Sequence, residues 1–210
     1  MITLVLCVLA VLSAGLTTAC EVRTRRGIFY VLKPLTMALI ILVALAAPIP
    51  VPAVYKTFIL AGLLCSLAGD VFLMFPEKWF ELGLVAFLAA QVLYILAFKP
   101  EAGGGVSAPV LLPFLLYALL LFRMLAPGLG KLKLPVLVYT AAITAMAWLA
   151  ACRFVYRGGT KPLLAFVGAV LFLVSDSVLA YDRFAGKLRP ARLLILGTYF
   201  PAQLLIALSV

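Results

Sequence analysis

The chain has 210 residues, of which 67% are hydrophobic and only 11% are charged, and its net charge is +10. Soluble domains are nearer half apolar and a quarter charged, so this composition excludes a soluble globular protein. The basic residues lie in short connections between apolar runs without interleaved aromatic residues, which argues against nucleic acid as a partner. The chain lacks histidine, and its four cysteines have no metal or redox spacing. Histidine-dependent triads are therefore excluded, and no metal or cofactor is expected.

Eight apolar runs follow one another along the chain, and each is close to the ~20 residues that a helix needs to cross a membrane. The runs lack the alternation of apolar and polar residues that is typical of β-barrel strands. The sequence therefore predicts one all-α domain over residues 1–210, an integral, multi-pass membrane bundle of eight transmembrane helices. The expected spans are 1–19, 28–47, 57–75, 82–98, 109–126, 135–152, 162–181 and 191–210.

The first run, residues 1–19, has an alternative interpretation as a signal peptide. The tetrapeptide "TTAC" at residues 17–20 faintly resembles a lipoprotein cleavage site. However, no basic segment precedes the run, and the run is longer than the apolar part of a typical signal peptide. An ordinary first span is the favoured interpretation.

Lysine and arginine indicate orientation, because they favour the cytoplasmic side of a membrane protein. Connections that follow odd-numbered spans carry Arg23, Arg25, Arg26, Lys78, Arg123, Lys131, Lys133, Arg183, Lys187, Arg189 and Arg192. Connections that follow even-numbered spans carry Lys56, Lys99, Arg153, Arg157 and Lys161. The larger set predicts that the odd-to-even connections are cytoplasmic and that both termini lie outside. The three charges between residues 153 and 161 weaken this bias.

The two halves of the chain resemble each other around two aspartates. "GLLCSLAGDVFLMF" from Gly62 aligns without gaps on "GAVLFLVSDSVLAY" from Gly168, which places Asp70 opposite Asp176. Since the third and seventh spans run in the same direction, this alignment predicts a parallel 4+4 internal repeat about an axis along the membrane normal. Chance similarity between apolar segments is the competing explanation.

Asp70 and Asp176 lie inside apolar spans, where a charge costs from ~3 to ~10 kcal/mol or more. Residues placed at such a cost are functional candidates. Lys33 in the second span and Tyr199 in the eighth lie, like both aspartates, six or seven residues in from the same membrane face. At a helical rise of ~1.5 Å per residue, all four reach one depth, roughly a third of the way across a ~30 Å core. We therefore expect them to form one polar site.

Each candidate residue also has a structural interpretation. Lys33 has a side chain long enough to reach the near membrane surface. Alternatively, Lys33 forms a purely structural ion pair with the aspartates. Gln91 and Gln203 lie deeper, near the midplane, and with Tyr94 and Tyr199 they are also suited to ordinary hydrogen bonds between helices.

Two carboxylates in a medium of low dielectric do not easily ionise together. With Lys33 neutralising one charge, we expect one protonated aspartate that donates a proton and one ionised aspartate that accepts one. Such a pair supplies an acid and a base without histidine. It suits protonation of an acid-labile bond with activation of water opposite, the logic of a glycosidase.

Four segments carry a resemblance to a known family. They are "KPL" at 33–35, the run from "AGLLCSLAGD" to "LYILAF" at 61–98, "GAVLFLVSDSVLAYDRF" at 168–184 and "YFPAQLLI" at 199–206. The motifs KP, GD-x2-L, SD-x2-L and Y-x3-Q occur in that order. Over nearly its whole length the chain resembles the lysoplasmalogenase (YhhN-like) family of membrane proteins, which implies eight helices as well.

The resemblance implies a lipid-metabolising hydrolase. Its substrate would be a lysophospholipid, a lysoplasmalogen, whose vinyl ether bond is hydrolysed to a fatty aldehyde and glycerophosphoethanolamine or glycerophosphocholine. Membrane lipids are the other expected partners, and the oligomeric state is left open. The resulting site residues are Lys33, Asp70 and Asp176 for catalysis and Tyr199, Gln203, Gln91 and Tyr94 for substrate binding.

The chain departs from the family pattern at Gln91, where a histidine often stands. An amide does not titrate, so an enzyme that needed an acid or base at this position would be weak or altered in substrate. A small proton-coupled or lipid transporter is the alternative function, because buried carboxylates and parallel repeats are also typical of transporters. A structural protein is a third class, in which neutralising both aspartates leaves function intact.

Overall fold

The structure, a computed structural model, describes residues 1–23, 25–47, 51–75, 79–101 and 108–210. In these ranges it contains eight α-helices and no strand, and all eight are long and apolar enough to cross a membrane. The prediction of an all-α bundle with eight transmembrane helices is confirmed. The helices are α1 (Ile2–Val22), α2 (Arg26–Ala46), α3 (Ala53–Met74), α4 (Phe80–Glu101), α5 (Ala108–Leu125), α6 (Lys133–Arg157), α7 (Thr160–Phe184) and α8 (Ala191–Leu208).

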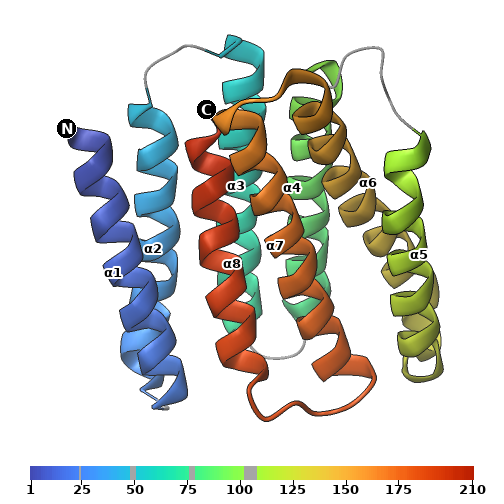
Figure 1. Cartoon of the computed structure of the whole chain (residues 1–210). Coiled ribbons are helices and arrows are strands. Elements are labelled where there is room, and N and C mark those ends of the chain that lie inside the picture. Colours follow the sequence, from blue (N-terminus) through green and yellow to red (C-terminus); the bar gives the residue numbers. More distant parts are fainter. Residues whose placement is uncertain (24, 48–50, 76–78, 102–107) are drawn as a thin grey trace.

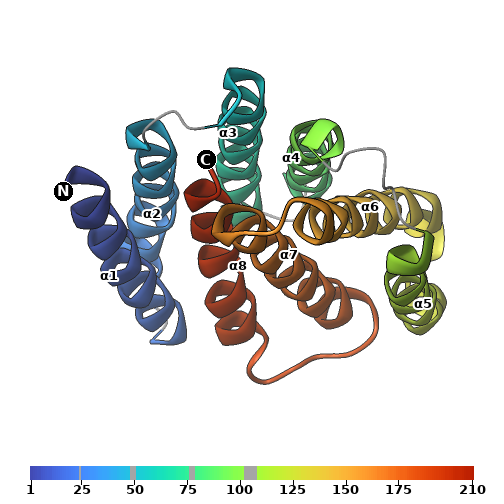
Figure 2. The same cartoon turned by 45° about the horizontal axis from the view of Figure 1, so that its top comes forward.

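Successive helices run in opposite directions, so both termini lie at the same end of the bundle (Figure 1). The helix α8 has a central place, where it packs against α7, α1, α2 and α3. The helices α1 and α5 lie at opposite edges, as Figure 2 also shows, and they are the least buried, as expected of helices that face lipid. Through α8 the fold therefore joins the helices that carry Lys33, Asp70 and Asp176.

A close approach between α7 and α8 holds two of the site helices together. A Cβ atom at Gly168 would lie only 2.8 Å from the carbonyl oxygen of Ala202, so a larger residue would force the helices apart. Small residues allow such contacts between membrane helices. Glycine at this position therefore helps to place Asp176 of α7 and Tyr199 of α8 along one cavity.

The end of α6 and the start of α7 lie beyond the predicted spans 135–152 and 162–181. Helical hydrogen bonding continues past the first charged residues, so only Gly158 and Gly159 separate the two helices. Both glycines have positive φ angles, +62° and +81°, which other residues rarely adopt. Arg153 therefore belongs to α6 rather than to a loop. It is buried, and its guanidinium carbon lies 4.3 Å from the centre of the Tyr55 ring.

The orientation of the termini and the 4+4 internal repeat both stay predictions. Lys78, one of the charges counted for the orientation, lies outside the described residues. Burial of Arg153 within α6 removes one charge from the smaller of the two sets.

Candidate active site

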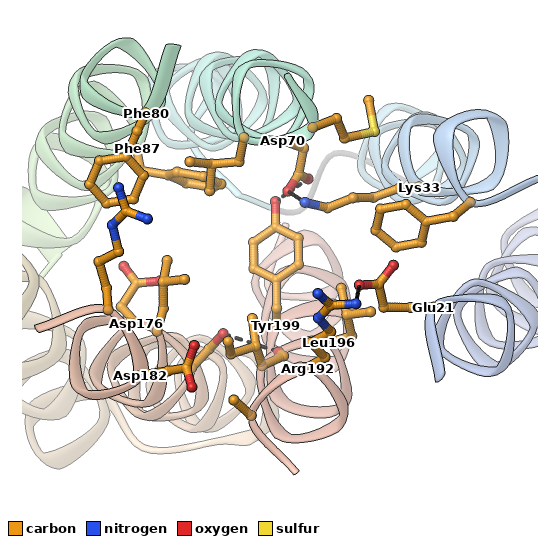
Figure 3. A pocket seen from close by; sticks show the side chains of 18 of the residues that line it. Glu21, Lys33, Asp70, Phe80, Phe87, Asp176, Asp182, Arg192, Leu196 and Tyr199 are labelled. Atoms are coloured by element: carbon orange, nitrogen blue, oxygen red, sulfur yellow. Dashed lines mark hydrogen bonds and ion pairs between the residues drawn. The ribbon is translucent and has the colours of Figure 1, made fainter. Parts of the chain in front are cut away.

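A cavity of about 390 Å³ is lined by residues from the last turns of α1, α3 and α7 and the first turns of α8. These helix ends lie at the end of the bundle opposite the two termini (Figure 1). The cavity walls come from α1, α2, α3, α4, α7 and α8, and Figure 3 shows the side chains that line the cavity. The volume lies within the ~300–1,000 Å³ typical of small-molecule sites. Lys33, Asp70, Asp176 and Tyr199 all line this cavity. The four helices thus bring the four residues to one place, as their common depth predicts.

Asp70 is held by two donors inside the bundle. The Nζ atom of Lys33 lies 2.9 Å from its Oδ1, and the hydroxyl of Tyr199 donates to its Oδ2 at 2.5 Å. Asp70 is 1% exposed and Lys33 is 8% exposed, so solvent screens this ion pair little. Figure 3 shows the three polar ends together, with the Lys33 side chain directed toward Asp70 and Tyr199.

The backbone beside Lys33 is unusual, because Pro34 follows it inside α2. Proline removes one backbone donor, which a membrane helix tolerates when its neighbours compensate. From this segment of α2 the Lys33 side chain reaches across to Asp70 on α3. The KP motif therefore combines a buried cation with a local interruption of the helical hydrogen bonds.

Asp176 has neutral partners. The hydroxyl of Tyr139 on α6 donates to its Oδ2, and the Nε2 atom of Gln91 on α4 donates to the same oxygen at 3.3 Å. Among the described residues, no ion pair reaches Asp176, and no hydrogen bond reaches its Oδ1. Asp176 is half-buried, whereas Gln91 is fully buried and its Oε1 has no hydrogen-bond partner. The second carboxylate, which lines the cavity, thus has one oxygen without a hydrogen bond from the described residues.

Three further polar residues form a separate network deeper in the bundle. The Tyr94 hydroxyl donates to Oε1 of Gln203 at 2.8 Å, and Nε2 of Gln203 donates to the Ser66 hydroxyl at 3.1 Å. All three are fully buried. Neither Tyr94, Gln203 nor Gln91 belongs to the described lining of the cavity, so direct contact of these residues with a substrate stays a prediction.

Aromatic rings fix Tyr199 in place. The rings of Phe87 and Phe172 meet the Tyr199 ring edge-on, each at a centroid distance of 5.9 Å. Such arrangements are favourable because the positive edge of one ring meets the negative face of the other. The Tyr199 hydroxyl is therefore positioned by packing as well as by its bond to Asp70.

Tyr139 and Ser66 belong to the hydrogen-bond networks but are missing from the residues expected from sequence. Each has a hydroxyl inside an apolar run, which is the same signal that selects Tyr94 and Tyr199. That signal does not tell which hydroxyl faces the bundle interior, because a helix that is apolar on all sides shows no preferred face.

Comparisons with known proteins agree on one family. A model of the YhhN family matches residues 28–210. Lysoplasmalogenase TMEM86B of Sus scrofa is 39% identical over 158 residues, which cover 74% of this chain and 64% of that protein. Lysoplasmalogenase TMEM86A of Bos taurus is 37% identical over 160 residues, 73% of this chain and 65% of that protein. The match therefore spans less than two thirds of the length of these relatives.

A bacterial relative matches over a longer stretch at lower identity. The uncharacterized membrane protein YhhN of Escherichia coli O157:H7 is 29% identical over 198 residues, which cover 94% of both chains. No solved structure matches this chain.

Proposed function

The chain belongs to the YhhN family, and from this premise we propose that it is an integral membrane hydrolase that cleaves the vinyl ether bond of lysoplasmalogens. Alkenyl-glycerophosphoethanolamine or alkenyl-glycerophosphocholine and water would give a fatty aldehyde and glycerophosphoethanolamine or glycerophosphocholine. The similarity to the two lysoplasmalogenases supports this reaction. The observation that carries it is one cavity in which two carboxylates, Asp70 and Asp176, have partners of different charge.

The partners of the two carboxylates support different roles for them. Asp70 pairs with the ammonium group of Lys33, which suits an ionised carboxylate. Asp176 is bonded by neutral donors, both at Oδ2, which leaves Oδ1 to carry a proton. We assign Asp176 as the general acid and Asp70 as the base, with Lys33 holding Asp70 in its ionised form. Tyr199 positions Asp70, and Gln91 positions Asp176.

In the first step Asp176 transfers its proton to the β-carbon of the vinyl ether. The carbon–carbon double bond becomes a single bond, and the positive charge is shared between the ether oxygen and its neighbouring carbon. A carboxylate fixed in the cavity stabilises such a cation without having to reorganise. The Asp70 carboxylate supplies this negative charge.

In the second step water attacks the cationic carbon, and Asp70 takes the proton that water loses. The product is a hemiacetal. It collapses when Asp70 returns that proton to the departing glycerol oxygen and Asp176 takes the proton of the hemiacetal hydroxyl. The carbon–oxygen bond to glycerol breaks, the aldehyde forms, and both carboxyl groups regain their starting states.

We place the alkenyl chain in an apolar groove that adjoins the cavity. A groove of about 630 Å³ lies between α1 and α8, and Leu196 lines both the groove and the cavity. A lysolipid can therefore keep its head near the membrane surface while its chain lies among the helices. The common depth of the site residues, roughly a third of the way into the hydrocarbon core, suits this placement.

We also infer from the distribution of basic residues that both termini lie outside and that the cavity opens toward the cytoplasm. Labelling of a cysteine introduced at Arg189 would test this orientation in sealed vesicles of known sidedness. Labelling from the cytoplasmic side alone is expected, and labelling from the outer side alone would reverse the assignment.

The direct test of activity follows aldehyde release from a lysoplasmalogen by the protein purified in detergent. Wild-type protein is expected to release aldehyde. Asp70→Asn and Asp176→Asn are each expected to lower kcat by about 10²–10⁴-fold, the range for loss of a general acid or base. Glu81→Gln is the matched control, since Glu81 is an exposed carboxylate outside the cavity lining.

Activity that survives both aspartate substitutions would overturn the acid–base roles. Uptake into liposomes driven by a pH gradient, with no aldehyde formed, would instead favour the transporter alternative. A Glu81→Gln variant that lost as much activity as the two aspartate variants would show that the loss is not specific to the cavity.

A further inference from the structure

The open end of the cavity is lined by charged side chains that the proposed chemistry does not use. They come from the end of α1, the end of α7, the connection that follows α7, and the start of α8. These charged rim residues are Glu21, Asp182, Arg183, Lys187 and Arg192.

Two ion pairs bring opposite charges together on this rim. Arg192 Nη1 lies 2.9 Å from Glu21 Oε1, and Lys187 Nζ lies 3.2 Å from Asp182 Oδ2. The basic partners are well exposed, at 63% for the Arg192 side chain and 81% for that of Lys187, whereas the acidic partners are mostly buried. Exposed pairs of this kind contribute only about 0–1 kcal/mol, so both cations can exchange partners at little cost. Figure 3 shows Glu21 and Arg192 paired at the edge of the cavity.

The distance from the rim to the catalytic groups matches the distance from the phosphate to the vinyl ether in the substrate. Arg192 precedes Tyr199 by seven residues on α8, a rise of about 10 Å along the helix axis. A phosphate on the third glycerol carbon is separated from the vinyl ether oxygen on the first carbon by a short chain of single bonds. With that oxygen beside Tyr199 and Asp70, the phosphate falls within reach of the long Arg192 side chain, and Lys187 lines the same cavity.

The start of α8 adds positive potential at the same place. Ala191, the first residue of α8, lines the cavity, and no side chain caps the helix. Uncapped N–H groups and the helix dipole both favour a negative group at such an end. Arg183 adds a third basic residue, with its guanidinium over the Phe80 ring at 4.8 Å. The positive groups of the rim thus come from two helices and their connection.

We propose that the charged rim is the head-group site, in which Arg192, Lys187 and Arg183 bind the phosphodiester of a zwitterionic lysophospholipid. This inference rests on the proposed function and names the residues of the same cavity that hold the head group of its substrate. On binding, phosphate replaces Glu21 beside Arg192 and Asp182 beside Lys187. The two released carboxylates then face the ammonium group of ethanolamine or choline, while the three basic side chains share the phosphate.

Three substrates with the same alkenyl chain separate head-group binding from catalysis: alkenyl-glycerophosphoethanolamine, alkenyl-glycerophosphate and alkenylglycerol, which lacks phosphate. Arg192→Gln and Lys187→Gln are each expected to lower kcat/KM about tenfold on both phosphate-containing substrates, as loss of a charged hydrogen bond does. The change is expected mainly in KM. On alkenylglycerol, kcat/KM of both variants should equal that of wild type.

Arg189→Gln is the matched control, because Arg189 is an exposed arginine of the same connection that does not line the cavity. It is expected to behave like wild type on all three substrates. The head-group site would be overturned if the Arg192→Gln and Lys187→Gln variants lost as much activity on alkenylglycerol as on the two phosphate-containing substrates. It would also be overturned if they lost no activity on the phosphate-containing substrates. In both cases aldehyde release by wild-type protein would still uphold the proposed function. Absence of aldehyde from all three substrates with wild-type protein would overturn both.

Discussion

The two aspartates of the cavity lie in similar positions on α3 and α7, but their surroundings differ. Asp70 is fully buried and is bonded by the cation of Lys33 and by the Tyr199 hydroxyl. Asp176 is half-buried and is bonded by two neutral donors. The difference lies in the cation, since each carboxylate also accepts a hydrogen bond from a tyrosine.

This difference matters because the free-energy cost of burying a charge depends on whether a partner of opposite charge lies beside it. Removing one member of a buried ion pair leaves the other uncompensated, whereas a carboxyl group among neutral donors can be neutral itself. Asp70 should therefore contribute to folding as well as to catalysis. Asp176 should contribute to catalysis with little effect on stability.

The largest expected effect is a loss of stability when the Asp70 carboxylate is removed. Asp70→Asn leaves the Lys33 ammonium buried without a counter-ion, so the free energy of unfolding should fall by about 3–5 kcal/mol. Asp176→Asn should lower it by less than about 1 kcal/mol, because the amide oxygen can still accept from Tyr139. Thermal unfolding of both purified variants in the same detergent measures the difference. Equal losses of stability would contradict the distinction between the two sites.

A smaller effect is expected for the coupling energy between Lys33 and Asp70, which a double-mutant cycle measures separately from the other contacts of both residues. Lys33→Met alone should destabilise the protein, because Asp70 then lacks its cation. The double variant Lys33→Met, Asp70→Asn should recover at least about 2 kcal/mol of the summed losses, since no uncompensated charge remains. A double-mutant cycle on unfolding free energies measures this coupling. The double variant should stay inactive, and additive losses would show that the two residues act independently.

The smallest effects are expected when the hydroxyl of Tyr199 or of Tyr139 is removed. Tyr199→Phe removes a donor from the fully buried Asp70 and should lower the free energy of unfolding by about 1–3 kcal/mol. Tyr139→Phe removes a donor from the half-buried Asp176 and should cost about 1 kcal/mol or less, with about a tenfold fall in kcat. Unfolding and steady-state assays on the same preparations measure both. The opposite order of stability losses would contradict the assignment.

Much of the architecture follows from the sequence, because the bilayer limits what a chain can do. Backbone groups in hydrocarbon must bond within the segment, so each apolar run of about 20 residues becomes a helix. The fixed rise per residue then converts position along the chain into depth. For this reason Lys33, Asp70, Asp176 and Tyr199 could be expected at one level, and all four line the cavity.

Other features could not be predicted from single spans. The separate network of Tyr94, Gln203 and Ser66, and the bond from Tyr139 to Asp176, depend on how each helix is rotated. The pairing of Glu21 with Arg192 depends on α1 and α8 being neighbours. The short connection after α6 could not be predicted either, because hydropathy marks the end of an apolar run rather than the end of hydrogen bonding.

The sequence by itself determined the number of helices and the depth of the ionisable groups, because length and helical rise are properties of each segment alone. Only the tertiary structure decided that Lys33 pairs with Asp70 and that Asp176 is bonded by Gln91 and Tyr139. Pairing depends on helix rotation and on which helices are neighbours. Both are set by packing between segments, and a run that is apolar on every side does not encode them locally.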